Sequence, residues 1–92
     1  MTAEQTELFH VSLLRVLDRN STSFGLGVSA LSILIGEFGF NPKPEEVLEA
    51  MEYMEDPNIG FVVTVNKGAF NPTARTWKKT ALGTNELRKR GY

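Results

Sequence analysis

The hydrophobic pattern of the chain changes its period once, and this change limits the fold more than any other feature. Up to Asp56 the apolar residues recur at helical spacing, whereas Phe61–Val65 is a run of β-branched and aromatic residues typical of a strand. Helices followed by strands within 92 residues predict one α+β domain over residues 1–92. This length is enough for one modest core without disulfides or metal ions.

The first helical segment, residues 4–18, carries more apolar surface than one neighbouring layer needs. Leu8 belongs to a broad apolar face, but Val11 and Leu14 fall outside that face. Such a helix is either buried deeply or also contacts another protomer. Leu8, Val11 and Leu14 are therefore the candidates for a dimer or partner interface.

Two further helices are expected between the first helix and the strand run. One opens at Val28 or Ser29 and stops at Gly39, because glycine suits the left-handed conformation that ends many helices. A turn follows, and Pro44 fits the first position of the next helix. That helix closes at the Asp-Pro-Asn sequence that begins with Asp56.

A β-hairpin and a short helical turn are expected in the last third of the chain. Residues 61–65 form the first strand and residues 76–80 the returning strand, joined by a loop dense in turn-forming residues. Thr84 is the expected cap of a single helical turn, with Leu87 as its apolar anchor. Residues 24–27 can supply a very short extended piece.

The order helix, helix, helix, hairpin is that of the winged-helix superfamily. The third helix and first wing strand of many bacterial winged-helix regulators resemble the run Val47-x3-Met51-x2-Met54-Glu55-Asp56 followed by Gly60-Phe61-Val62. The second wing strand and following helix of the multiple-antibiotic-resistance (MarR) and PadR types of regulator are similar to Trp77-Lys78-Lys79-Thr80-Ala81-Leu82-Gly83-x3-Leu87-x3-Gly91. The resemblance covers roughly residues 28–91. It implies a winged helix: a three-helix bundle with a C-terminal two-stranded β-hairpin wing and a short terminal helical turn.

The net charge of −1 hides opposite charges in the two parts of the chain. Residues 1–66 hold three basic and ten acidic residues, a net of −7. Residues 67–92 hold seven basic residues and the single acid Glu86, a net of +6. This division can direct a polyanion to one end of the molecule. A solvated basic end without any partner is an equally good interpretation.

The basic C-terminal part supplies the candidate nucleic-acid contacts. Its lysines and arginines are interleaved with asparagine and threonine residues that can reach phosphates or a minor-groove edge. The candidates are Lys67, Asn71, Arg75, Lys78, Lys79, Arg88, Lys89 and Arg90. Trp77 and Phe70 are candidates for stacking on bases, although a strand tryptophan more often closes a core.

The third helix departs from the pattern of a DNA-reading winged helix. In DNA-binding members its exposed side usually enters the major groove, but here that side is acidic. The acidic residues are Glu45, Glu49, Glu52 and Asp56. Phosphates would repel this row, which leaves two interpretations: a solvated helix with acids near its positive dipole end, or a face that binds a protein partner.

Catalysis, metal binding and membrane insertion have little support in the sequence. The chain has no cysteine and only one histidine, His10, so neither a Cys–His nucleophile pair nor a metal site can be assembled around it. Gly25-Leu26-Gly27 lacks the third glycine of a phosphate-binding loop. The N-terminus shows no leader pattern, and the apolar stretches are too short for a bilayer. We expect a cytoplasmic protein that is not an enzyme and needs no cofactor.

Two functions from different classes remain open. The first is a DNA-binding winged-helix protein, a transcriptional regulator that acts as a homodimer and contacts double-stranded DNA through its basic wing and C-terminus. The second is a winged-helix protein-interaction module, in which the acidic third helix or the apolar first helix contacts a protein partner.

Overall fold

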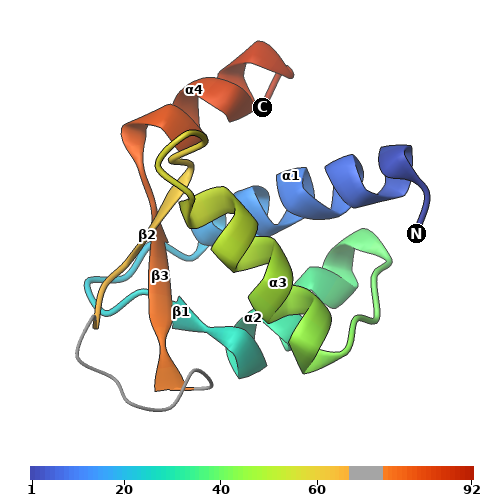
Figure 1. Ribbon diagram of the computed structural model, residues 1–92, viewed down its shortest axis with the longest axis horizontal. Helices are drawn as coiled ribbons and strands as arrows, with labels where there is room; N and C mark the ends of the chain where they lie inside the picture. Colours follow the sequence, from blue (N-terminus) through green and yellow to red (C-terminus); the bar gives the residue numbers. More distant parts are fainter. Residues whose placement is uncertain (67–73) are drawn as a thin grey trace.

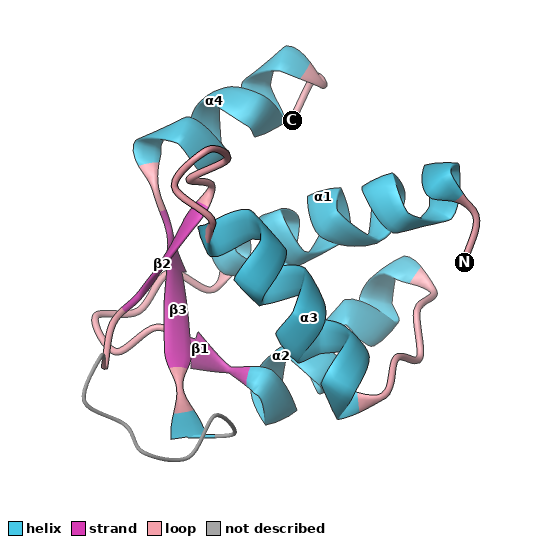
Figure 2. Cartoon of the chain, viewed as in Figure 1, coloured by secondary structure: helices cyan, strands magenta, loops and turns pink. Residues whose placement is uncertain are grey.

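Four α-helices and a three-stranded antiparallel sheet make up the part of the chain that the computed structural model describes, residues 1–66 and 74–92 (Figure 1). The elements in order are α1 (Ala3–Arg19), β1 (Leu26–Gly27), α2 (Val28–Leu34), the 3-10 helix η1 (Ile35–Phe38), α3 (Pro44–Glu55), β2 (Val62–Thr64), β3 (Thr76–Lys79) and α4 (Ala81–Lys89). The helices surround one face of the small sheet (Figure 2). The expected α+β class is therefore confirmed.

The helix boundaries follow local signals in the sequence. Thr2 caps α1, because its side chain accepts a hydrogen bond from the Gln5 amide at 3.1 Å while the Gln5 side chain accepts one from the Thr2 amide at 2.9 Å. Gly39 follows η1 in the left-handed conformation, with φ of 86°, as expected. Pro44 occupies the first position of α3, which also confirms a prediction.

The sheet has three strands, so the expected two-stranded hairpin is wrong in this respect. The strand order is β1-β3-β2, and β3 pairs with both neighbours. In β1 Leu26 lies opposite Trp77, and in β2 Val63 lies opposite Lys78. A strand of two residues leaves no alternating pattern in the sequence, and its pairing depends on the return of β3 from a distant part of the chain.

The C-terminal helix α4 is longer than the single turn expected, and it begins earlier. Thr80, and not Thr84, is its cap, with the Thr80 hydroxyl accepting a hydrogen bond from the Gly83 amide at 3.2 Å. The Thr80 amide also donates to the Phe61 carbonyl at 3.0 Å, which ties the start of α4 to β2. Leu87 is buried, as an apolar anchor should be.

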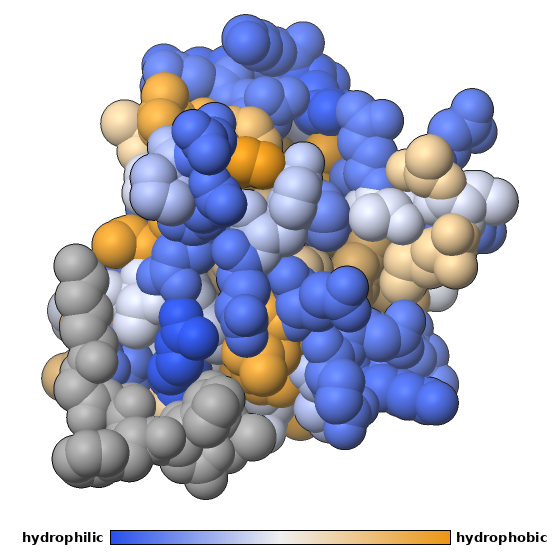
Figure 3. All heavy atoms as spheres, in the orientation of Figure 1, coloured by the Kyte–Doolittle hydropathy of each residue, from blue (hydrophilic) through white to orange (hydrophobic). Residues whose placement is uncertain are grey.

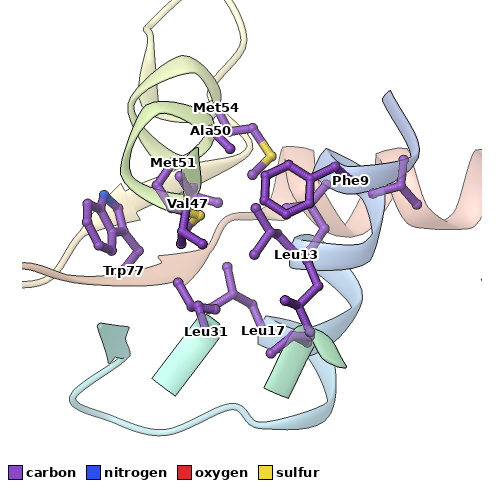
Figure 4. Close-up of a cluster of buried hydrophobic side chains, with 14 of the residues drawn as sticks. Phe9, Leu13, Leu17, Leu31, Val47, Ala50, Met51, Met54 and Trp77 are labelled. Carbon is purple, nitrogen blue, oxygen red and sulfur yellow. The ribbon is translucent and has the colours of Figure 1, made fainter. Parts of the chain in front are cut away.

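The hydrophobic core lies between α1, α2, α3 and β3 (Figure 4). Phe9, Leu13 and Leu17 of α1 face the apolar side of α3, and Leu31 of α2 lies beside them. Trp77 closes the β3 side of the core with none of its surface exposed. Its ring is therefore packed inside the protein, where it cannot stack on a base.

Candidate functional site

The exposed side of α3 carries a line of four carboxylates. Its members recur at intervals of four, three and four residues, which places them along one narrow stripe of a helix. These residues are Glu45, Glu49, Glu52 and Asp56, called the acidic stripe below, and all four are exposed. The opposite side of α3 is fixed in the core through Val47, Ala50, Met51 and Met54. Because the apolar side of α3 is buried, these acids lie on its solvent-facing side.

The acidic stripe has no ion pair within the described residues, and the same holds for Glu4 and Glu46. Five other acids are each paired with a nearby arginine or lysine. The pairs are Arg19–Glu37 at 2.8 Å, Lys79–Asp18 at 3.2 Å, Arg75–Glu55 at 2.5 Å, Arg90–Glu86 at 3.0 Å and Arg90–Glu7. None of the four stripe carboxylates is in this set. No arginine or lysine among the described residues neutralises their charge, although the Asp56 carboxylate accepts a hydrogen bond from the Asn58 amide at 2.9 Å.

Arg75, a candidate nucleic-acid contact, is instead part of an internal network at the end of α3. Its guanidinium contacts Glu55 and donates to the Thr64 hydroxyl at 3.0 Å, while the Thr64 amide donates to Glu55 at 2.7 Å. Partial burial favours a higher pKa for Glu55, but the Thr64 hydrogen bonds and the Arg75 charge outweigh it, so the pKa lies below its ordinary value. Arg75 is therefore committed to holding α3 against β2 and β3.

Lys79, a second candidate contact, joins three elements inside the protomer. Its Nζ lies 3.2 Å from Asp18 at the end of α1 and donates to the Thr84 hydroxyl of α4. Only 17% of the Lys79 side chain is exposed. Release to a phosphate would leave Asp18 without its partner, so Lys79 is a structural cation.

The remaining basic candidates are divided between two elements. Lys78 is partly exposed on β3, and Arg88 and Lys89 are exposed in the last turn of α4. Arg90 is held by Glu86 and Glu7. α4 leads away from the end of β3, so its last turn lies away from the sheet (Figure 1). The expected continuous basic surface is absent among the described residues; Lys67, Asn71 and Phe70 lie outside them.

Two of the three expected interface residues on α1 are covered within the protomer. Val11 is 4% exposed and Leu14 is 1% exposed, so neither presents the exposed side chain that was expected on α1; both instead lie at the base of a groove described next. α4 packs against α1 in this region, and no local pattern indicates a contact between elements so far apart in the chain. Leu8 alone of the three is exposed, at 53%.

A groove between α1, α3 and α4 was not anticipated from the sequence. It has a volume of about 870 Å³. Its floor is apolar and consists of Phe9, Val11, Leu14, Ala50, Met54 and Phe61. Its rim carries Glu7, Glu46, Glu49, Glu86 and Arg90. The groove depends on residues from three elements distant in sequence, and this explains why no linear pattern indicated it.

His10 and Tyr53 form an aromatic pair at the groove. Their rings are 4.9 Å apart between centroids and inclined by 24°, which is a stacked arrangement. Burial lowers the pKa of His10 below its ordinary value of 6.5. The imidazole is therefore neutral at pH 7 and adds aromatic surface to the groove without adding positive charge.

Among residues 1–66 and 74–92, no three histidine, cysteine or acidic side chains are arranged to hold a metal ion. No helix in these two ranges has both the length and the apolar character needed to cross a membrane. Comparison of the chain with protein-family models, curated proteins and solved structures gave no match.

Proposed function

We propose that the protein is a winged-helix protein-interaction module whose α3 face binds a partner with a basic surface. The winged-helix assignment is supported by the order of elements, with α1, β1, α2, α3 and then the β2–β3 pair. It is also supported by the placement of β3 between β1 and β2, which ties the wing strands to the helical bundle.

The observation that carries this proposal is that the acidic stripe forms no ion pair with any residue that the structure describes. Four exposed carboxylates on one helix repel one another, whereas the described acids Glu7, Asp18, Glu37, Glu55 and Glu86 are paired. A partner with matching lysine or arginine residues relieves this repulsion, steers encounter and fixes the orientation of binding. Complementary charge therefore favours a basic protein surface as the ligand of α3.

The same charges count against DNA as the ligand of α3. A duplex carries about one negative charge per 1.7 Å of its axis, so four carboxylates in the major groove would be strongly repelled. The wing gives less compensation than the sequence suggested, because Arg75 and Lys79 are engaged with Glu55 and Asp18. DNA binding remains the competing function, carried by the partly exposed Lys78 and the exposed Arg88 and Lys89.

The test uses the full chain as immobilised bait in an extract of its native cells, with captured proteins identified by mass spectrometry. Capture of a basic protein by the wild type should be lost with Glu52→Lys, which places a positive charge in the middle of the stripe. Glu4→Lys is the matched control, since it changes the net charge equally but lies in the first turn of α1. It should capture the partner as the wild type does.

DNA binding is tested in parallel with a mixed-sequence duplex in a mobility-shift assay at low and physiological salt. No shift at physiological salt is the expected result. A tight shift that Lys78→Ala weakens and Glu52→Lys leaves unchanged or strengthens would overturn the proposal in favour of the DNA-binding function.

A further inference from the structure

We propose that the groove between α1, α3 and α4 binds a basic amphipathic segment of the partner. The segment is a short helix with apolar side chains on one face and lysine or arginine residues along its edges. This inference rests on the proposed function, and it adds where on the surface the partner inserts and what chemistry it presents.

The floor of the groove supplies the apolar part of the recognition. Phe9, Ala50 and Met54 belong to the core and form the base of the groove, where Phe9 and Ala50 are 2% and 3% exposed and Met54 is fully buried. Phe61 is partly exposed beside them. Apolar side chains that settle on this floor are removed from water, which contributes about 25 cal/mol per Å² of apolar surface buried. Figure 3 shows this side of the molecule as mainly hydrophilic, with smaller apolar areas between the polar ones.

The rim supplies the charge selectivity. Its carboxylates come from all three walls: Glu7 from α1, Glu46 and Glu49 from α3, and Glu86 from α4. The one basic residue that lines the groove, Arg90, already contacts both Glu7 and Glu86. The rim is therefore net negative, and this favours a cationic segment over a neutral or acidic one.

The aromatic pair strengthens the same preference. Tyr53 is 53% exposed, and its ring is stacked on His10. A lysine or arginine that reaches the Tyr53 ring gains a cation–π contact, because the neutral His10 adds no positive charge to oppose it. The apolar floor matches the apolar face of a basic amphipathic helix, and the acidic rim and the Tyr53 ring match the lysine or arginine residues along its edges.

The size of the groove fits a segment of a partner and not a whole domain. A volume of about 870 Å³ lies in the range of ordinary ligand pockets, roughly 300–1,000 Å³. Two or three large apolar side chains fill such a space. An amphipathic helix places such side chains three or four residues apart, which is a common arrangement for helices that bind in grooves.

The test measures binding of a fluorescein-labelled peptide to the full chain by fluorescence anisotropy. The peptide has about 14 residues, roughly 21 Å as a helix, with leucines on one face and lysines along both edges. A second peptide has glutamate in place of every lysine. We expect saturable binding of the lysine peptide and no binding of the glutamate peptide.

Two charge reversals on α3 distinguish the groove from the outer stripe. Glu49 belongs to both, whereas Glu52 belongs to the stripe only. Glu49→Lys should weaken the lysine peptide about tenfold, and Glu52→Lys should change its affinity less than twofold, because charges that do not border the groove are screened by water and salt. Tyr53→Ala should also weaken binding, and circular dichroism checks that each variant is folded.

Amide chemical shifts map the bound peptide independently of the variants. Shifts at Thr6, His10 and Tyr53, with none at Ile33 of α2, support the groove. Equal losses for Glu49→Lys and Glu52→Lys would overturn the groove and leave the stripe proposal standing. Failure of the lysine peptide to bind would also overturn it. Chemical-shift changes at the groove residues that depend on protein concentration in the absence of peptide would overturn it as well, since a second copy of the protein would then fill the groove. The capture experiment above judges the stripe separately.

Discussion

The Nη2 atom of Arg75 lies 2.5 Å from the Oε1 atom of Glu55, and this contact joins the end of α3 to the residue that precedes β3. The Thr64 amide and hydroxyl also donate to the Glu55 carboxylate, so one acid organises groups from α3, β2 and the start of β3. Arg75, a candidate nucleic-acid contact in the sequence, is therefore an ion-pair partner inside the protein.

Removal of Glu55 should therefore destabilise the fold more than removal of a surface acid. Glu55→Ala leaves Arg75 and the Thr64 amide without their acceptor, which costs about 1–3 kcal/mol of the free energy of unfolding. Urea denaturation of Glu55→Ala, Arg75→Ala and the double variant measures this. We expect a coupling energy of at least about 0.5 kcal/mol, and strictly additive single effects would contradict the network.

The Glu55 network should also contribute to acid stability. Because the pKa of Glu55 is lowered in the folded state, its contribution is fully present above the unfolded value of about 4.5. It is lost as pH falls through the lower folded pKa. Glu55→Gln removes this titration, so the difference in unfolding free energy between wild type and variant should shrink between pH 5 and pH 2. A difference that stays constant over this range would mean that Glu55 is not held in its charged form by its neighbours.

His10 should make the fold less stable in mild acid. Its pKa is lowered by burial, so below pH 6.5 the unfolded chain binds a proton more readily than the folded one, and stability falls. NMR titration of the His10 ring should give a pKa below 6.5. Tyr53→Ala uncovers one face of the ring, so it should bring the pKa back towards 6.5. An unchanged His10 pKa in this variant would show that other neighbours cause the burial.

Gly83 should tolerate no side chain. A Cβ atom at this position would lie 2.5 Å from the carbonyl oxygen of Phe61, the residue before β2. Gly83→Ala is expected to cost about 1–3 kcal/mol, since the backbone must move apart. Gly36→Ala is the matched control, because a Cβ atom there meets nothing within 4 Å. Thermal unfolding followed by circular dichroism compares the two; equal midpoints would contradict the close approach.

The elements governed by local signals could be predicted from the sequence. Pro44 and Gly39 mark boundaries through their own backbone preferences, so the limits of α3 and η1 followed from single residues. The start of α4 is predicted too late, at Thr84, because the sequence pattern assigns Thr80 to the returning strand, whereas in the structure the Thr80 hydroxyl caps the helix. The β1–β3 pairing joins residues about fifty positions apart and leaves no local pattern.

The exposed acids of α3 were predictable for the same reason, since an amphipathic helix fixes which side faces out. The ion pairs of the basic residues could not be predicted from the sequence. Lys79 and Asp18 come from distant parts of the chain, and nothing at either position indicates the other. Charge counts report how many ions a segment holds, whereas pairing across the fold decides how many remain available to a partner.

The acidic stripe should lower the stability of the free protein, because its like charges repel one another. Glu49→Gln with Glu52→Gln removes two like charges spaced three residues apart on α3, so the free energy of unfolding should rise by a few tenths of a kcal/mol at low salt. The gain should shrink in 1 M NaCl, where the Debye length is about 3 Å. Urea denaturation at the two salt concentrations measures both effects. The same variant should capture less of the partner, since Gln keeps the shape of Glu but not its charge. A variant that is more stable yet captures the partner normally would show that these carboxylates are not the contact.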